Sequence, residues 1–280
     1  MVLTQLFQRI GIRNDAVQLL FSGFFYALLG IGIARVIFSN NIGLVAVFLI
    51  SIALIPTIHD RLSKKKFHGF QLPEKENRTL ASVGKWELNE LMENYRSVFQ
   101  AYTFTFFGVF MAFALIALFL SGGEVRQLFG DQLNAIGSAG APDFFMQVIV
   151  NNLGVLLIAF AISLLFKYGI TFIVTWNASV WGTVFALQSI QFASTHQLNP
   201  LVQFALIMIV VFPHTIAEAA AYFSAAISGG ILNKAFTQQK WWGNTFNQYS
   251  EHAAIMLLLG VALVVLASAI ESVVAIVFFS

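Results

Sequence analysis

The sequence contains no cysteine, and only 10% of its 280 residues are charged. Without cysteine the chain can form no disulfide, no thiolate nucleophile and no cysteine metal site. The shortage of charge excludes an ordinary soluble domain, in which roughly 25% of the residues are charged. Net charge is only +2, so the distribution of the basic residues is more informative than their sum.

Long hydrophobic stretches take the place of the missing charge. Hydrophobic residues make up 58% of the chain, and the mean hydropathy is +0.80. Several of the apolar runs approach or exceed the ~20 residues that a helix needs to cross a bilayer. The sequence therefore predicts an all-α, polytopic integral membrane protein with about seven transmembrane helices.

The chain divides into three predicted parts. Residues 1–58 hold a short polar start and a transmembrane hairpin, whose second helix we expect to end at Pro56. Residues 59–97 form a basic cytoplasmic loop, and the end of this loop, from about Val83 to Tyr95, is typical of an amphipathic helix. Residues 98–280 form a five-helix membrane core.

The spans of the core follow from its apolar stretches, at about 98–120, 144–166, 170–190, 201–230 and 253–279. Polar linkers at 191–199 and 231–252 separate the last three, and a short surface helix is expected at Glu124–Leu133. The stretch 201–230 is longer than one crossing requires, and Pro213 removes a backbone donor from its middle. We therefore expect a helix that is kinked there, or two half-helices.

The basic residues predict the orientation. With a cytoplasmic N-terminus and seven crossings, all but two of the 15 Lys and Arg residues fall on the cytoplasmic side, the exceptions being Arg35 and Arg126. We expect a multi-pass protein of the cell (cytoplasmic) membrane with an external C-terminus.

One polar helix stands out inside the membrane core. In PHTIAEAAAYFSAAISGG, the segment Pro213–Gly230, the residues His214, Glu218 and Tyr222 are four apart and share one helical face. The remaining positions are mostly Ala, Ser and Gly, which let neighbouring helices approach closely. A carboxylate inside a membrane needs a partner or a proton, so we expect the other helices to enclose Glu218.

Other polar residues lie within the predicted spans. Asn151 and Asn152 are near the external end of their span and can cap that helix. Trp176 and Asn177 lie deeper, where an amide must hydrogen-bond across helices or line a polar cavity. Glu271 lies in the last span.

Four interpretations of His214 and Glu218 stay open. The simplest is a packing network in which His214 donates to Glu218 or to a carbonyl freed near Pro213. A metal site would need Glu271 as a third ligand, and no HExxH motif occurs. An intramembrane hydrolase would use the pair to move protons, but GxSxG and paired aspartates are absent. Proton-coupled transport through Glu218 would suit a broken span, although no internal repeat is visible.

Four motifs resemble a known family. The segments VNNLGVLL, YGITFIVTWNASVWG, PHTIAEAAAYFSAAISGGI and SAIESVV are similar, in this order, to signatures of the stage II sporulation protein M family. The N-terminal hairpin and its charged loop resemble the archaeal branch, so the resemblance spans nearly the whole chain. Thr215 departs from the family, which typically has glycine there. The family's marked residues correspond to Asn151, Asn152, Trp176, Asn177, His214, Glu218 and Glu271.

The resemblance implies a non-enzymatic membrane scaffold. In spore-forming bacteria the family member joins two peptidoglycan-degrading partners during engulfment and has no established catalysis. For this chain it implies a scaffold of an envelope or membrane-remodelling assembly, with no catalytic residues, metal, cofactor or nucleic acid. The alternatives are a small transporter or channel with Glu218 and Glu271 along a polar path, and a metal-dependent hydrolase at His214 and Glu218.

The expected partners follow from the same interpretation. They are the lipid bilayer, other membrane or envelope proteins, and a second copy of the chain. The small-residue face Ala217–Gly230 favours such homo-oligomers, because small side chains let two helices pack at short distance.

Overall fold

The computed structural model describes residues 14–64, 85–134, 144–166, 168–238 and 243–278. In these residues the chain forms helices and no strand. The helices are α2 (Asp15–Ile37), α3 (Ile42–Lys64), α4 (Lys85–Phe119), α5 (Gly122–Asn134), α6 (Phe144–Leu165), α7 (Gly169–His196), α8 (Pro200–Gln238) and α9 (Asn244–Phe278). Seven of them, all except α5, are long and apolar enough to cross a membrane. The predicted all-α architecture with seven spans is confirmed.

The N-terminal hairpin is built from α2 and α3. Asn14 caps α2, because its side chain accepts a hydrogen bond of 2.9 Å from the Ala16 amide. Between the helices Asn41 adopts a left-handed conformation with φ of 53°, which asparagine tolerates better than most residues. Beyond this turn, α3 continues through Pro56 to Lys64.

The predicted end of α3 at Pro56 is therefore wrong. A proline inside a helix removes one backbone hydrogen bond and crowds the carbonyl four residues earlier. Here that carbonyl belongs to Ile52, which lies on the exposed side of the helix, while Leu54 and Ile58 are buried on either side of the proline. Packing of these side chains holds the helix together across Pro56.

Several helices also extend past the predicted spans. The expected linker 191–199 is helical as far as His196, and the expected linker 231–252 is helical to Gln238 and again from Asn244. The amphipathic helix begins at Lys85 and is continuous with the third span. Hydropathy detects where a helix leaves the lipid and not where the helix ends. Outside the bilayer a helix can continue with polar side chains, because water solvates them there. The middle of the basic loop lies outside the described residues.

Helix α8 passes through Pro213 as one continuous helix. The alternative of two half-helices is therefore wrong, and a kink at Pro213 stays a prediction. The pyrrolidine ring is exposed at this point, so no neighbouring helix obstructs it.

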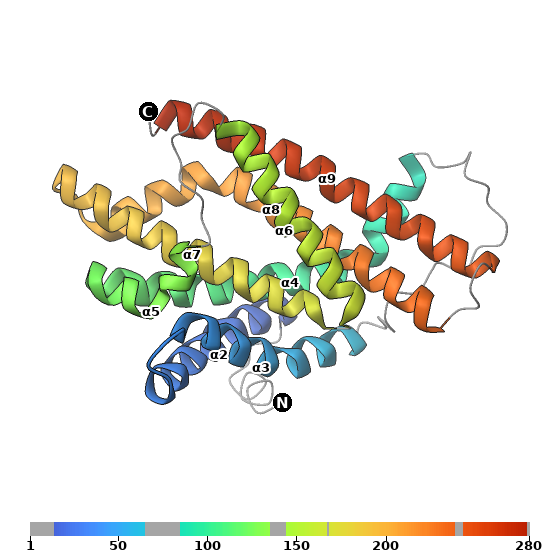
Figure 1. Ribbon diagram of the computed structural model, residues 1–280, viewed down its shortest axis with the longest axis horizontal. Coiled ribbons are helices and arrows are strands. Elements are labelled where there is room, and N and C mark those ends of the chain that lie inside the picture. Colours follow the sequence, from blue (N-terminus) through green and yellow to red (C-terminus); the bar gives the residue numbers. More distant parts are fainter. Residues whose placement is uncertain (1–13, 65–84, 135–143, 167, 239–242, 279–280) are drawn as a thin grey trace.

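The helices form two groups that meet at α7 and α8 (Figure 1). Helices α2, α3, α4 and α5 pack together and against α7, which is the most completely buried of the seven spans. Helices α6 and α9 pack on α8. Helix α8 therefore contacts both groups. Its polar face points toward α6 and α9.

Contacts along α8 fix the directions of its neighbours. Tyr222 contacts Asn152 and, further along, Asn233 contacts Leu164, so α6 runs parallel to α8. Toward α9 the order is reversed, because Gly260 lies against Ala221 whereas Ser228 bonds to Ala253. Parallel packing of α6 and α8, with the antiparallel α9 beside them, is the arrangement expected if each helix crosses the membrane once.

Helix α5 is the predicted surface helix, and it begins with a capping box. The Glu124 carboxylate accepts hydrogen bonds from the Ser121 amide at 2.9 Å and from the Ser121 hydroxyl at 2.8 Å. The Glu124 amide in turn donates to the Ser121 hydroxyl at 3.4 Å. These reciprocal bonds satisfy donors that the first turn of a helix otherwise leaves open. Val125 and Phe129 on the other face are buried and dock α5 on the bundle.

The capping box predicts an acid-sensitive start of α5. Hydrogen bonds from the Ser121 amide and hydroxyl hold the pKa of the Glu124 carboxyl below its usual value. The stabilisation is therefore complete above the unfolded-state pKa of about 4.3 and is lost as pH falls through the lower folded-state pKa. As the pH is lowered from about 5 to about 3, we expect the melting temperature of the wild type to fall more than that of Glu124→Gln. Parallel pH profiles for the two proteins would contradict the capping role.

Candidate functional site

A buried side-chain cluster joins α6 to α8. The Tyr222 hydroxyl lies 2.7 Å from the Glu218 carboxylate and 3.2 Å from the Asn152 side-chain oxygen. Glu218, Tyr222 and Asn152 are 7%, 3% and 4% exposed. The spacing of four residues on α8 points Glu218 and Tyr222 in the same direction, and the parallel register of α6 brings Asn152 to the same place. Tyr222 is the link between the two helices.

The chemistry of the hydroxyl orients the hydrogen bonds in this cluster. A tyrosine hydroxyl has one proton, so it donates to only one of its two neighbours. The shorter of the two contacts assigns that proton to Glu218. The Asn152 amide nitrogen is buried without a hydrogen-bond partner among the described residues, and turning the amide over brings this nitrogen to the Tyr222 oxygen. The bonds then run from Asn152 to Tyr222 to Glu218, each strengthening the next.

His214 and Glu271 lie near the Glu218 end of the cluster. His214 is one turn before Glu218 and is buried, and its Nδ1 has no hydrogen-bond partner in the described part of the chain. Glu271 on α9 is half-buried and close enough to Glu218 for an electrostatic interaction. Helical side chains lean toward the N-terminus of their own helix. Because α8 and α9 are antiparallel, the two carboxylates therefore lean toward each other.

The register of α8 and α9 supports this convergence. Gly260 lies opposite Ala221, so in an antiparallel pair the turn that contains Ser268 comes opposite His214. Ser268 is fully buried, and its hydroxyl oxygen has no partner among the described residues. On the side of the cluster that faces α9, buried polar groups of the described residues thus lack hydrogen-bond partners.

The remaining predicted site residues lie apart from this cluster or at its edge. Asn151 is exposed on α6, and its side-chain amide lies 3.4 Å from that of Asn152. When the Asn152 amide is turned over, Asn151 keeps this bond by turning over as well and accepting through its oxygen. Trp176 is half-buried against the core. Asn177 donates to the Ile173 carbonyl of its own helix at 2.9 Å. This bond of Asn177 stays within α7, and the alternative that Asn177 lines a polar cavity stays a prediction.

Two further interhelical bonds hold α8 and were not predicted from the sequence. The Ser228 hydroxyl donates to the Ala253 carbonyl of α9 at 2.5 Å, and Asn233 donates to the Leu164 carbonyl of α6 at 2.7 Å. Between them Gly229 is so close to α6 that an added Cβ would meet the Phe160 carbonyl oxygen. The only sequence signal was a run of small and polar residues in an otherwise apolar helix.

The cluster does not have the composition of a metal centre. Among the described residues no group of three or more His, Cys, Asp or Glu side chains is placed to hold a metal ion. His214 and Glu218 share a face, but Glu218 is engaged by Tyr222 and Glu271 does not complete a ligand set. What the arrangement does is join α6 to α8 through Tyr222, with Glu218 on α8 and Glu271 on α9 beside this link.

The cluster lies within a segment that has known relatives. The family model for stage II sporulation protein M matches residues 101–276, which is more than half of the chain. No curated protein and no solved structure matches this sequence. The matched segment runs from α4 to α9 and contains Asn152, Glu218, Tyr222 and Glu271. The chain belongs to the stage II sporulation protein M family.

Proposed function

We propose that the protein is a non-enzymatic membrane scaffold of the archaeal type of this family, which organises an envelope or membrane-remodelling assembly. Membership of the family supports this assignment. The observation that carries it is structural: the three longest of the described helices, α4, α8 and α9, have 35 or more residues, and their polar extensions lie at the same end of the bundle. Such an end offers a helical platform outside the membrane.

The lengths of α4, α8 and α9 support the platform. Helix α8 has 39 residues and α4 and α9 have 35 each, which correspond to about 58 Å and about 52 Å against a hydrocarbon core of ~30 Å. Ring contacts of Phe99 with Phe223 and of Phe107 with Phe212 make α4 antiparallel to α8. The start of α4, the end of α8 and the start of α9 therefore lie together, at the right of Figure 1.

The charge of this end supports a cytoplasmic location for the platform. Arg96 near the start of α4 and Lys234 near the end of α8 are both found there. Basic residues are retained on the cytoplasmic side of a membrane. We therefore propose that the N-terminus is cytoplasmic, that the C-terminus is external, and that the partners of the scaffold are recruited from the cytoplasmic side.

The polar cluster supports a rigid platform better than a reaction centre. The hydrogen bonds of Tyr222 connect α8 to α6, and Ser228 connects α8 to α9. Hydrogen bonds between buried groups of different helices favour one arrangement of those helices. These bonds hold α9 and α8, two of the three helices that the platform uses, in fixed relative positions, with α6 beside them.

Homo-oligomerisation requires a different face from the one expected. The small-residue face Ala217–Gly230 packs inside the protein, and residues 221–230 are all buried, so that face is not accessible to a second copy. The first half of α8 exposes Leu206, Ile209 and Phe212 instead. We propose that a second copy of the chain contacts this apolar stripe.

Site-specific photo-crosslinking in native membranes tests the scaffold. We expect a photoreactive residue at Thr237 or Thr245, both exposed at the extended end, to give discrete protein adducts. The same residue at the exposed Leu198, in the turn at the opposite end of α8, is the control and should give none of these adducts. Adducts that are absent at all three positions would contradict the proposal.

The competing functions have their own readouts on the same preparation. Purified protein in liposomes should show no ion flux that depends on Glu218, and flux that is abolished by Glu218→Gln would favour the transporter. The unmatched polar atoms of His214 and Ser268 beside the carboxylates are the observation that favours transport. One bound metal per chain, lost in both Glu218→Gln and His214→Ala, would favour the hydrolase.

A further inference from the structure

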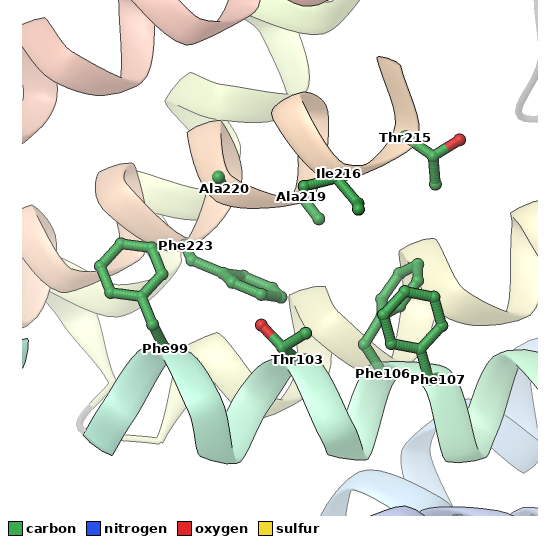
Figure 2. Close-up of a pocket in the computed structure, with 9 residues that line it drawn as sticks. All are labelled: Phe99, Thr103, Phe106, Phe107, Thr215, Ile216, Ala219, Ala220 and Phe223. Atoms are coloured by element: carbon green, nitrogen blue, oxygen red, sulfur yellow. The ribbon is translucent and has the colours of Figure 1, made fainter. Parts of the chain in front are cut away.

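A groove separates α4 from α8 on the side of α8 that faces away from the polar cluster. The space between the helices, counted together with the open region outside them, is about 370 Å³. Figure 2 shows Phe99, Thr103 and Phe107 of α4 pointing toward Ile216, Ala219 and Phe223 of α8. The lining is therefore mostly apolar, with aromatic rings on both sides.

The groove arises from the sizes of the facing side chains. Phe99 and Phe223 contact each other at one end, with ring centroids 6.3 Å apart, and Phe107 contacts Phe212 at the other end at 5.9 Å. Between these two contacts α8 presents Ala219, which is too small to reach α4. The large rings hold the helices apart, and the small residue leaves the space between them empty.

The groove opens toward the surroundings of the protein. Ile216 at its edge is 45% exposed, and Phe99, Thr103 and Phe107 are half-buried. In a helix that crosses the bilayer, an apolar opening of this kind meets lipid. The occupant that the surroundings supply is an acyl chain.

A cation marks one end of the groove. Arg96, Phe99, Thr103 and Phe107 are spaced by three, four and four residues, so they follow one face of α4. Arg96 is exposed, and no carboxylate pairs with it in the part of the chain that the structure describes. Arginine binds phosphate in a bidentate manner, which makes it suited to a phospholipid headgroup.

The length of this face matches one leaflet. From Arg96 to Phe107 the rise is about 16 Å, roughly half of the ~30 Å hydrocarbon core. We propose that the groove between α4 and α8 binds one acyl chain of an anionic phospholipid whose phosphate is held by Arg96. A free phosphate ion would use only Arg96 and would leave the aromatic groove empty.

Lipid retention by the purified protein tests this site. The protein is equilibrated in mixed micelles with equal amounts of phosphatidylglycerol and phosphatidylcholine, and bound lipid is counted by native mass spectrometry. The wild type should retain one phosphatidylglycerol in preference to phosphatidylcholine. Arg96→Gln should lower that preference about fivefold, the contribution of one basic residue near an anionic lipid surface. Arg35→Gln, at the other membrane face, is the matched control and should leave the preference unchanged.

A second variant tests the groove separately from the charge. Ala219→Phe fills the space between the two ring contacts and should abolish retention of both lipids, whereas Ala205→Phe on an exposed part of α8 should not. If Ala219→Phe does not fold, phosphatidylglycerol with a photoreactive acyl chain is applied to the wild type. Labelling should then concentrate on residues 99–107 and 216–223.

Several outcomes would overturn the site. Labelling spread evenly over all exposed apolar helices would show ordinary annular lipid. An unchanged preference in Arg96→Gln would contradict the contact between Arg96 and the headgroup. Retention of lipid by a folded Ala219→Phe variant would show that lipid does not bind in the groove. Adducts of these residues to another protein in native membranes, with no lipid label in the purified protein, would assign the groove to a partner helix.

Discussion

Replacing Gly108 by alanine is expected to lower the melting temperature of the purified protein by roughly 6 to 12 °C, because overpacking here costs about 3 kcal/mol. A Cβ at this position would meet the Leu20 carbonyl oxygen and would lie 2.9 Å from the Phe24 amide nitrogen. Both atoms belong to the α2 backbone, so neither can rotate away. Gly23 makes the reciprocal approach, since its Cβ would lie 2.6 Å from the Thr105 carbonyl oxygen of α4.

The control for this experiment is another glycine in the same pair of helices. A Cβ at Gly32 in α2 would meet no atom within 4 Å. Gly32→Ala should therefore be neutral or stabilising by about 0.5 to 1 kcal/mol, since alanine is the better helix former. Thermal unfolding in one detergent compares the two variants. Equal melting temperatures would contradict the close approach of α2 and α4.

Tyr222→Phe is expected to destabilise the protein by roughly 2 to 3 kcal/mol, although it leaves no cavity. The substitution removes only the hydroxyl that donates to Glu218 and contacts Asn152. Both partners are buried, so each keeps an unmatched polar group that water cannot reach. Thermal unfolding should show the loss. Tyr26→Phe is the control, because no hydrogen bond of the Tyr26 hydroxyl occurs within the described residues.

A double-mutant cycle separates a packing role from any other role of the carboxylate. Glu218→Gln keeps an acceptor for Tyr222 and should cost little by itself. In the Tyr222→Phe background the same change removes an unpaired carboxylate and should recover part of the lost stability. A coupling energy near zero would mean that Glu218 is held by groups other than Tyr222.

The sequence allowed the membrane-crossing segments to be predicted, because their signal is local. Twenty apolar residues are sufficient evidence for a span. The true helix ends are less local: α7 continues to His196 and α8 to Gln238 with polar residues that hydropathy excludes. The prediction at Pro56 failed for the same reason. Packing of the side chains on both sides of a proline decides whether the helix continues, and this packing is not visible in the local sequence.

Within the candidate site, sequence patterns predicted neighbours on one helix and not between helices. The spacing of Glu218 and Tyr222 predicted their common face. The contact with Asn152 depends on how far α6 is shifted along α8, and that shift is set by contacts such as Gly229 against Phe160. Asn152 and Asn177 look alike in the sequence, yet one faces a neighbouring helix and the other bonds to its own backbone.

The parallel pairing of α6 with α8 has a consequence for biogenesis. Membrane helices are synthesised in chain order, so α6 enters the bilayer while α8 is still two spans away from completion. During that interval the Asn152 amide has no tyrosine to bond, and the carbonyl of Leu164 lacks the asparagine that later caps it. We therefore expect α6 to stay near water or near the insertion machinery until Tyr222 has been synthesised, and to move into lipid together with its later partner.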